Sequence, residues 1–210
     1  MVVGFGGICY NLRQRPFGRI IETRSRKMQK VVFVAHCVLN TASKVVMYND
    51  AEMAAEEALR RKFLQKALED GVQIVQLPCP EFLLYGSRRW GHVSDQFDTP
   101  YFRKECRRML SEIMLQLKEY RSNGSRFEVL GIVGIDGSPS CGVDYTCRGE
   151  WGGNLNDRDD LQKAIASARL VEGMGILMDE LRAMLKEEGI DLPVAGLFAD
   201  EPDKVMALLI

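Results

Sequence analysis

The sequence predicts an α/β protein with a single domain, in which a mainly parallel, Rossmann-like three-layer sheet is flanked by helices. Apolar runs rich in Val and Ile, typical of strands covered on both faces, alternate with longer segments of helical periodicity. Strands and helices in this order favour right-handed crossovers and parallel pairing. With 210 residues, 46% of them hydrophobic, the chain is long enough for one sizeable core.

The sequence pattern in the first half of the domain predicts two strands joined by a helix. Residues 31–36 form a nearly continuous apolar run, and residues 72–77 form another. Between them, apolar residues recur every four positions, as on one face of a helix, until Gly71 ends the pattern. Pro78 and Pro80 prevent the second strand from continuing as a central strand.

The sequence pattern in the middle of the chain predicts a loop, a helix and a third strand. Residues 82–98 are rich in Gly, aromatic and charged residues and predict a long loop of the kind that binds ligands or covers a site. Thr99 and Pro100 form a typical helix start, and apolar positions then follow one helical face. Residues 127–135 form the third apolar run.

The last third begins with a polar, glycine-rich passage that extends through Asn156. A helical region follows and ends at Gly189. Residues 194–198 predict a fourth strand, and residues 202–210 a short terminal helix.

Charge separates the first 29 residues from the domain at 30–210. Residues 1–30 hold seven basic residues and one acidic residue, whereas the remainder holds 21 basic and 28 acidic residues. Residues 1–29 also lack helical or strand periodicity, so we expect a poorly ordered extension and hypothesise that synthesis begins at Met28. A transit peptide is the alternative.

Composition also restricts location and partners. The acidic domain lacks the basic surface that nucleic-acid binding needs, and the chain has no run of about 18 apolar residues that would span a membrane. Six cysteines in 210 residues do not make a short disulfide scaffold, and no secretory signal is recognisable. We therefore expect a cytoplasmic protein, monomeric or homodimeric, with a small-molecule partner.

Each of the first three predicted strands leads into a loop that carries a cysteine. Cys37 follows the first strand, Cys79 lies in the sequence Pro-Cys-Pro-Glu after the second, and Cys141 lies in a Gly, Ser and Pro loop after the third. Ligands of parallel α/β sheets bind outside the carboxyl ends of the strands. We therefore expect the three cysteines to meet at one edge of the sheet.

Three such thiols without a Cys-x-x-Cys pair are atypical of a zinc finger. A [4Fe-4S] cluster is the better chemical match, because three ligands in place of four leave one iron open as a Lewis acid toward sulfur. Cys106, on an apolar helix face, is interpreted as a small core residue. Cys147 is the main competitor for a fourth ligand, and Cys9 is assigned no role.

Three motifs resemble the signatures of the thiouracil desulfidase family. They are A-H-C-V-L-N at 35–40, L-P-C-P-E at 77–81 and G-S-P-S-C-G at 137–142. The resemblance extends from about Val31 to the C-terminus. It implies that Cys37, Cys79 and Cys141 hold a [4Fe-4S] cluster, and that the enzyme hydrolyses the thiocarbonyl of a thiolated small molecule, such as a thiouracil, with release of sulfide.

The sequence departs from the commoner pattern of that family. Its first motif lacks the usual Leu-Gly after the cysteine and a nearby Arg-Tyr-Asp segment, and R-R-W-G at 88–91 replaces a Pro-Arg element. It is similar to a related branch of desulfidases. The departures concern the substrate more than the cluster.

Polar residues near the motifs suggest catalytic roles. Glu81 is predicted to act as general base for water or as acid for the leaving sulfide, with a loop or helix-start carboxylate as the alternative. Ser138 is predicted to bind substrate or water, unless it only bonds the backbone of its turn. His36 is interpreted first as a satisfied core histidine, with a hydrogen-bond donor to cluster sulfur as the alternative. Arg88 and Arg89 are interpreted as either a solvated pair or a clamp for an anionic substrate.

Two other functions remain open from the sequence. A non-catalytic module that senses metal or redox state would use a saturated four-ligand site that includes Cys147. A thiolate-based sulfur transferase would form a persulfide on one cysteine and would work without iron.

Overall fold

A parallel sheet with strand order β2-β1-β3-β6 forms the centre of the molecule. In this computed structural model, residues 28–154 and 156–210 are described. The strands are β1 (Gln29–Val34), β2 (Gln73–Gln76), β3 (Phe127–Ile135) and β6 (Val194–Leu197). All three pairings are parallel, which confirms the predicted α/β class and the Rossmann-like arrangement.

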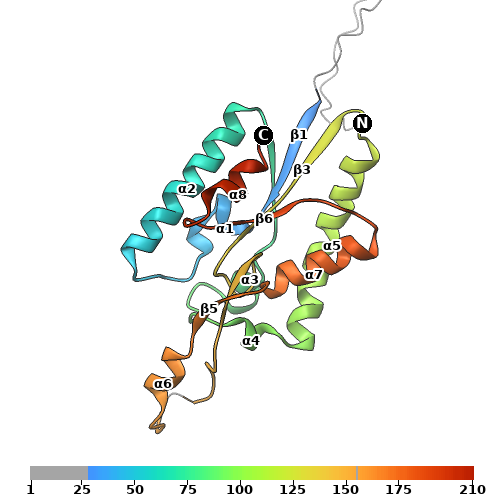
Figure 1. Ribbon diagram of the computed structural model, residues 1–210. Coiled ribbons are helices and arrows are strands. Elements are labelled where there is room, and N and C mark those ends of the chain that lie inside the picture. The colour runs from blue at the N-terminus through green and yellow to red at the C-terminus, as the bar shows by residue number, and fades with distance from the viewer. Residues whose placement is uncertain (1–27, 155) are drawn as a thin grey trace, which may run out of the picture.

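Helices cover both faces of this sheet and produce three layers (Figure 1). One face carries α2 (Asp50–Glu69) and α8 (Pro202–Ala207), and the other carries α5 (Pro100–Ser122) and α7 (Ile176–Glu187). The start of α5 is as predicted, since the Thr99 hydroxyl accepts a hydrogen bond from the backbone N–H of Phe102.

The core lies between the sheet and these helices. β1 is central, and its residues Val31–Val34 are almost completely buried, which explains why the run has no polar alternation. Phe63 of α2 packs against one face and Phe102 and Leu110 of α5 against the other, each with at most 1% of its surface exposed. The apolar helix faces read from the sequence are therefore the faces that are buried.

Short elements gather at the carboxyl end of the sheet (Figure 1). Those nearest the strands are α1 (His36–Leu39), the 3-10 helix η1 (Thr41–Ser43), α3 (Pro80–Tyr85) and α4 (Ser94–Phe97). An arm made of the antiparallel strands β4 (Tyr145–Arg148) and β5 (Arg169–Glu172), with α6 (Leu161–Ala166) between them, projects beyond this end.

The loop predicted at residues 82–98 is only partly correct, because two short helices occupy its two ends and only residues 86–93 between them form no helix or strand. Helix α3 covers its first part because Pro80 supplies a pre-set first turn and the Cys79 sulfur accepts a hydrogen bond from the N–H of Phe82. Helix α4 follows, where the Gln96 side chain accepts from the backbone N–H of Val93. Both helices are short, and their capping side chains, those of Cys79 and Gln96, are weak indicators of a helix start in a sequence.

Two other boundaries differ from the sequence predictions. The first strand ends at Val34 instead of His36, because the chain turns there and the His36 carbonyl accepts from the Asn40 N–H and the Gln76 side chain. The passage through Asn156 was expected to be irregular but contains β4, whose four residues pair with β5, a strand that was not predicted. Four-residue strands give little periodicity to detect.

The predictions for the first 27 residues lie outside the described part of the chain. Met28 and Gln29 are described, and Gln29 is the first residue of β1. Between residues 28 and 210, leaving out residue 155, no helix is long and apolar enough to cross a membrane.

Candidate functional site

The three cysteines lie at the carboxyl ends of three neighbouring strands. Cys79 follows β2, Cys37 follows β1 and Cys141 follows β3, so the strand order places Cys37 in the middle. Neighbouring strands lie about 4.8 Å apart, so these positions occupy a short stretch of the sheet edge. The stretch includes the boundary between β1 and β3, where the following helices cover opposite faces and where α/β proteins commonly bind ligands.

Three segments carry the cysteines. We call them the Cys37 segment (residues 35–44), the Cys79 segment (77–86) and the Cys141 segment (136–145). Cys37 lies in α1, Cys79 caps α3, and Cys141 lies in the loop between β3 and β4.

The Cys141 segment is held tightly by its own backbone. One carboxylate oxygen of Asp136 accepts three backbone N–H bonds, from Val143 (2.7 Å), Asp144 (2.9 Å) and Tyr145 (3.2 Å). The second oxygen of this carboxylate is buried without a hydrogen-bond partner and lies against Gly196, where a side chain would collide with it. Asp136 therefore closes the loop that presents Cys141.

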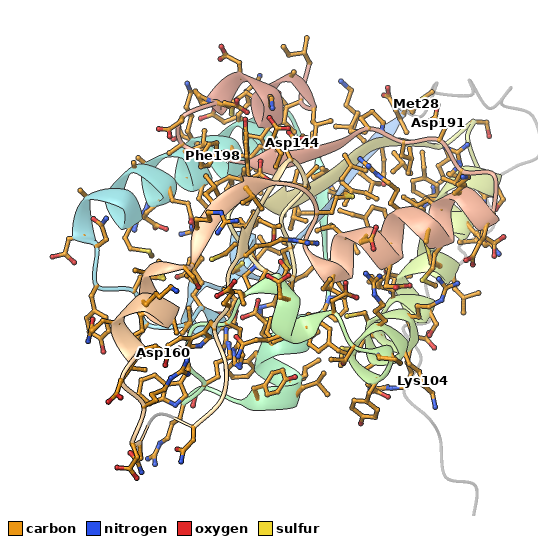
Figure 2. The ribbon with its side chains drawn as sticks, turned by 60° about the horizontal axis from the view of Figure 1, so that its bottom comes forward. Met28, Lys104, Asp144, Asp160, Asp191 and Phe198 are labelled. Atoms are coloured by element: carbon orange, nitrogen blue, oxygen red, sulfur yellow. The ribbon has the colours of Figure 1, made fainter. Side chains whose placement is uncertain are left out.

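Helix α7 and the α8 region hold the same segment from outside. The first N–H groups of α7 donate to the carbonyls of Pro139 and Ser140. Asp144 forms an ion pair with Lys204 of α8 at 2.9 Å. Figure 2 shows Asp144 close to Phe198 beside α8, far from Asp160 in the projecting arm.

The thiols of Cys79 and Cys141 are buried, and that of Cys37 is half-buried. Burial raises the pKa of Cys37 to about 12, an effect that Lys44 opposes and Cys79 increases. Burial raises the pKa of Cys141 well above its usual range, and Cys37 raises it more than Cys79 does, in keeping with the strand order. Burial also raises the pKa of Cys79. Without a bound cation the thiols are protonated at neutral pH, so metal binding would release protons.

Glu81 lies among the cysteines as a buried carboxylate with only 8% of its surface exposed. Its Oε1 atom accepts a hydrogen bond of 2.5 Å from the hydroxyl of Ser140, and its Oε2 atom accepts one of 3.2 Å from Nε of Arg89. Both donors come from other parts of the chain, and both side chains are almost fully buried. Glu81 is thus paired with a guanidinium, as a buried carboxylate requires.

The other residues proposed from the sequence have different surroundings. The Ser138 hydroxyl accepts from the backbone N–H groups of Cys141 (3.1 Å) and Ser140 (3.4 Å), which is the backbone-bonding alternative. His36 Nδ1 lies 2.9 Å from the Ser43 hydroxyl. Because the single proton of that hydroxyl is donated to the Asn40 carbonyl, Nδ1 of His36 is the donor.

The arginine prediction must be corrected. Arg89 is neither solvated nor free to bind an anion, because its side chain is 3% exposed and bonds to Glu81 and to two backbone carbonyls. Arg88 is exposed. Sequence reasoning missed that Arg89 compensates Glu81, since the two lie eight residues apart across a segment predicted as a loop.

Ser140 was also missed as a site residue. It lies next to Cys141 in the third motif, is completely buried, and its hydroxyl reaches both Glu81 and, at 3.5 Å, the Cys141 sulfur. Its position beside the motif cysteine was a signal that could have identified it.

The remaining cysteines lie apart from the three. The half-buried Cys147 is on β4, where burial and Asp95 raise its pKa. Cys106 is buried in the core on α5. A groove with a volume of about 450 Å³ lies at the opposite end of the sheet, between α7 and the start of β6, and contains no cysteine.

The arrangement bears on what the thiols can hold. Among residues 28–154 and 156–210, no three Cys, His, Asp or Glu side chains are arranged to hold a single metal ion. A multi-iron cluster is larger, and its thiolate ligands bind separate irons instead of converging on one point. Three neighbouring thiols on separate strand ends, two of them buried and one half-buried, fit such a group in number, chemistry and place.

Comparisons with known proteins give a relative but no function. No family model and no solved structure matches the chain. A match of 117 residues at 31% identity links the chain to the uncharacterized protein MJ0003 of Methanocaldococcus jannaschii, and covers 56% of this chain and 70% of that protein. The chain therefore belongs to the same family as MJ0003.

Proposed function

We propose that the protein is a [4Fe-4S]-dependent desulfidase that removes sulfur, as sulfide, from a thiolated small molecule such as a thiouracil-like heterocycle. The reaction is a hydrolysis, in which a C–O bond to water oxygen forms, the C–S bond breaks, and the two water protons leave with the sulfur. No external oxidant or reductant is required.

The observation that supports this proposal most is the location of three thiols, two buried and one half-buried, at adjacent strand ends beside a buried carboxylate. Cys37, Cys79 and Cys141 are proposed as the cluster ligands. When bound, the cluster supplies an iron open to the sulfur of the substrate.

Glu81 is proposed to handle the protons. Ser140 and Arg89 each occupy one lone pair of its two oxygens, and each carboxylate oxygen has a second. The carboxylate can therefore accept a hydrogen bond from the attacking water while it keeps its orientation, and its proton can go to the departing sulfide. Ser138 is proposed to bind substrate or water through its hydroxyl proton.

The raised pKa values argue against a thiolate-based sulfur transferase. Such an enzyme needs a nucleophilic thiolate, which positive neighbours or a helix N-terminus normally stabilise. At Cys37, Cys79 and Cys141 burial is the largest effect and raises the pKa, although Lys44 opposes it at Cys37 and the start of α3 opposes it at Cys79.

The surroundings of Cys147 argue against a saturated sensing module. The charged group that raises its pKa is Asp95 and not one of the three thiols. Its strand β4 pairs with β5 in a separate sheet, outside the edge that carries the other cysteines.

Iron and acid-labile sulfide per chain, measured after anaerobic purification or reconstitution, test the cofactor. We expect about four irons in the wild type, loss in Cys37→Ala, Cys79→Ala and Cys141→Ala, and retention in the matched controls Cys147→Ala and Cys106→Ala. Wild-type protein that takes up no iron would refute the proposal. Loss in Cys147→Ala would indicate a four-ligand site instead.

Sulfide release from thiolated pyrimidines tests the reaction on the iron-loaded protein. Glu81→Gln keeps the shape of the side chain but removes its basicity, so activity is expected to fall about 100-fold or more. A Glu81→Gln protein with full iron content and full activity would remove Glu81 from the mechanism.

A further inference from the structure

The three cysteine segments are joined to one another by side chains, and all the connections meet at Glu81. Glu81 itself belongs to the Cys79 segment. Its Oε1 atom is bonded to Ser140 of the Cys141 segment, and its Oε2 atom is bonded to Arg89.

Arg89 extends the connection to the Cys37 segment. Its Nη2 atom donates 2.7 Å to the backbone carbonyl of Ser43, and its Nη1 atom donates 3.1 Å to that of Gly86. Ser43, only 2% exposed, is bonded through its hydroxyl to His36, the neighbour of Cys37. One guanidinium thus binds the Cys37 segment at Ser43, the C-terminal end of α3 at Gly86, and Glu81 in the first turn of α3.

Because these groups are buried, the loss of any one of these hydrogen bonds is costly. Glu81, Ser140 and Ser43 are each less than 9% exposed, and the Arg89 side chain is 3% exposed. Water therefore cannot readily replace a lost partner, and hydrogen bonds to buried charged groups are among the stronger ones.

We propose that Glu81 is the junction that sets the relative positions of the three cysteine segments, with Ser140 as the positioning residue for Cys141 and Arg89 as the positioning residue for Cys37. This inference rests on the proposed function only in that the three thiols serve one cofactor. The junction itself can be tested in the protein without iron.

The proposal makes different predictions for its two connections, the one from Arg89 to the Cys37 segment and the one from Ser140 to the Cys141 segment. Arg89→Ala removes the bond to Ser43 and is expected to release the Cys37 segment, whereas Ser140→Ala is expected to release the Cys141 segment. The measurement is the rate of alkylation of each cysteine by iodoacetamide in the full-length, iron-free protein, resolved by peptide mass spectrometry. We expect a rise of about tenfold or more at Cys37 in the first variant and at Cys141 in the second.

The single proton of the Ser140 hydroxyl is donated to Glu81, so Ser140→Ala takes no donor from the Cys141 sulfur. Faster labelling of Cys141 in Ser140→Ala therefore reports opening of the segment. The exposed neighbour Arg88, changed to Ala, is the matched control for Arg89→Ala.

Cys106 serves as the internal monitor of folding, since it is completely buried on α5. Unchanged labelling of Cys37 and Cys141 in both variants would overturn the proposal. Equal acceleration of every cysteine, Cys106 included, would also overturn it, because global loosening would then replace a local junction. Arg89→Lys keeps the charge but not the forked donors, so its alkylation rate at Cys37 is expected to lie between those of the wild type and Arg89→Ala.

Iron content separates this inference from the proposed function. If the wild-type protein has the proposed junction, reconstituted Arg89→Ala and Ser140→Ala are expected to lose iron to a chelator at least several-fold faster than the wild type. Wild-type protein that binds no iron refutes the proposed function and leaves the labelling result to decide on the junction. Variants that retain iron as the wild type does and show wild-type labelling refute the junction and leave the proposed function intact.

Discussion

Gly175 offers a steric test of how the Cys141 segment is positioned. It immediately precedes α7, and its backbone packs against the chain at Ser140 and Cys141. A Cβ atom added at Gly175 would lie 2.7 Å from the Ser140 carbonyl oxygen and 2.8 Å from the Cys141 nitrogen. Its φ of −74° suits alanine, so Gly175→Ala introduces a collision without backbone strain.

The size of the effect follows from these distances. Ordinary contact begins at 3.4 Å, and the carbonyl carbon of Ser140 would lie closer still, so the Cys141 segment or the start of α7 must move by more than about 0.7 Å. Both partners are backbone, and α7 is bonded to this segment through the carbonyls of Pro139 and Ser140, so neither yields freely. Overpacking of this kind costs about 2 kcal/mol, which corresponds to a fall in Tm of about 4–8 °C for a domain of this size.

Thermal unfolding and iron uptake check the prediction. Gly152→Ala is the control, since an added Cβ there meets nothing within 4 Å and the glycine does not have a positive φ. We expect Gly175→Ala, but not Gly152→Ala, to lower Tm and to take up less iron. A Gly175→Ala protein with wild-type Tm and wild-type labelling of Cys141 would show that the contact is not restrictive.

Three further predictions concern other parts of the structure. Burial, with a smaller effect of Glu180, raises the pKa of Cys106 to about 12. Because the thiol therefore ionises at lower pH in the unfolded chain, the free energy of unfolding should fall above pH 9 by about 1.4 kcal/mol more per pH unit in the wild type than in Cys106→Ala. Urea unfolding between about pH 8.5 and 10.5 would reveal this difference. Asp136→Ala leaves three backbone N–H groups without their acceptor and should cost about 3 kcal/mol in urea unfolding, whereas Asp159→Ala at an exposed position should cost less than about 0.5 kcal/mol. Phe97→Ala should cost about 3–5 kcal/mol, because this fully buried ring stacks on another in the core; a loss below about 1 kcal/mol would contradict the described packing.

The sheet and its main helices could be predicted because their signals are long and consistent. Residues 127–135 form a strand over the whole predicted range, and α5 begins where Thr99 and Pro100 indicated. The position of each cysteine at a strand end followed from the same patterns. Parallel strands with helical crossovers then left few ways to arrange the sheet edge.

The details of the site could not be predicted because they depend on contacts distant in sequence. Whether Arg89 is solvated or buried depends on the Ser43 carbonyl, 46 residues away, and Glu81 meets Ser140 across 59 residues. Helix α3 was missed for a related reason, since a cysteine sulfur is an unusual capping group. Pairing of β4 with β5 joins segments separated by α6, and neither strand has enough residues to show alternation.

Two kinds of interaction therefore place the thiols, and they differ in robustness. Backbone ladders between β2, β1 and β3 set the distance between strand ends, and many bonds share that task. Beyond the strands, Asp136 and α7 hold the Cys141 segment, and the connections from segment to segment depend on the side-chain bonds of Glu81, Arg89 and Ser140. Substitutions at these three residues should disturb the site before the fold, because the ladders remain. Substitutions in the buried β1 residues should destabilise the whole domain, so that the fold and the site are lost together.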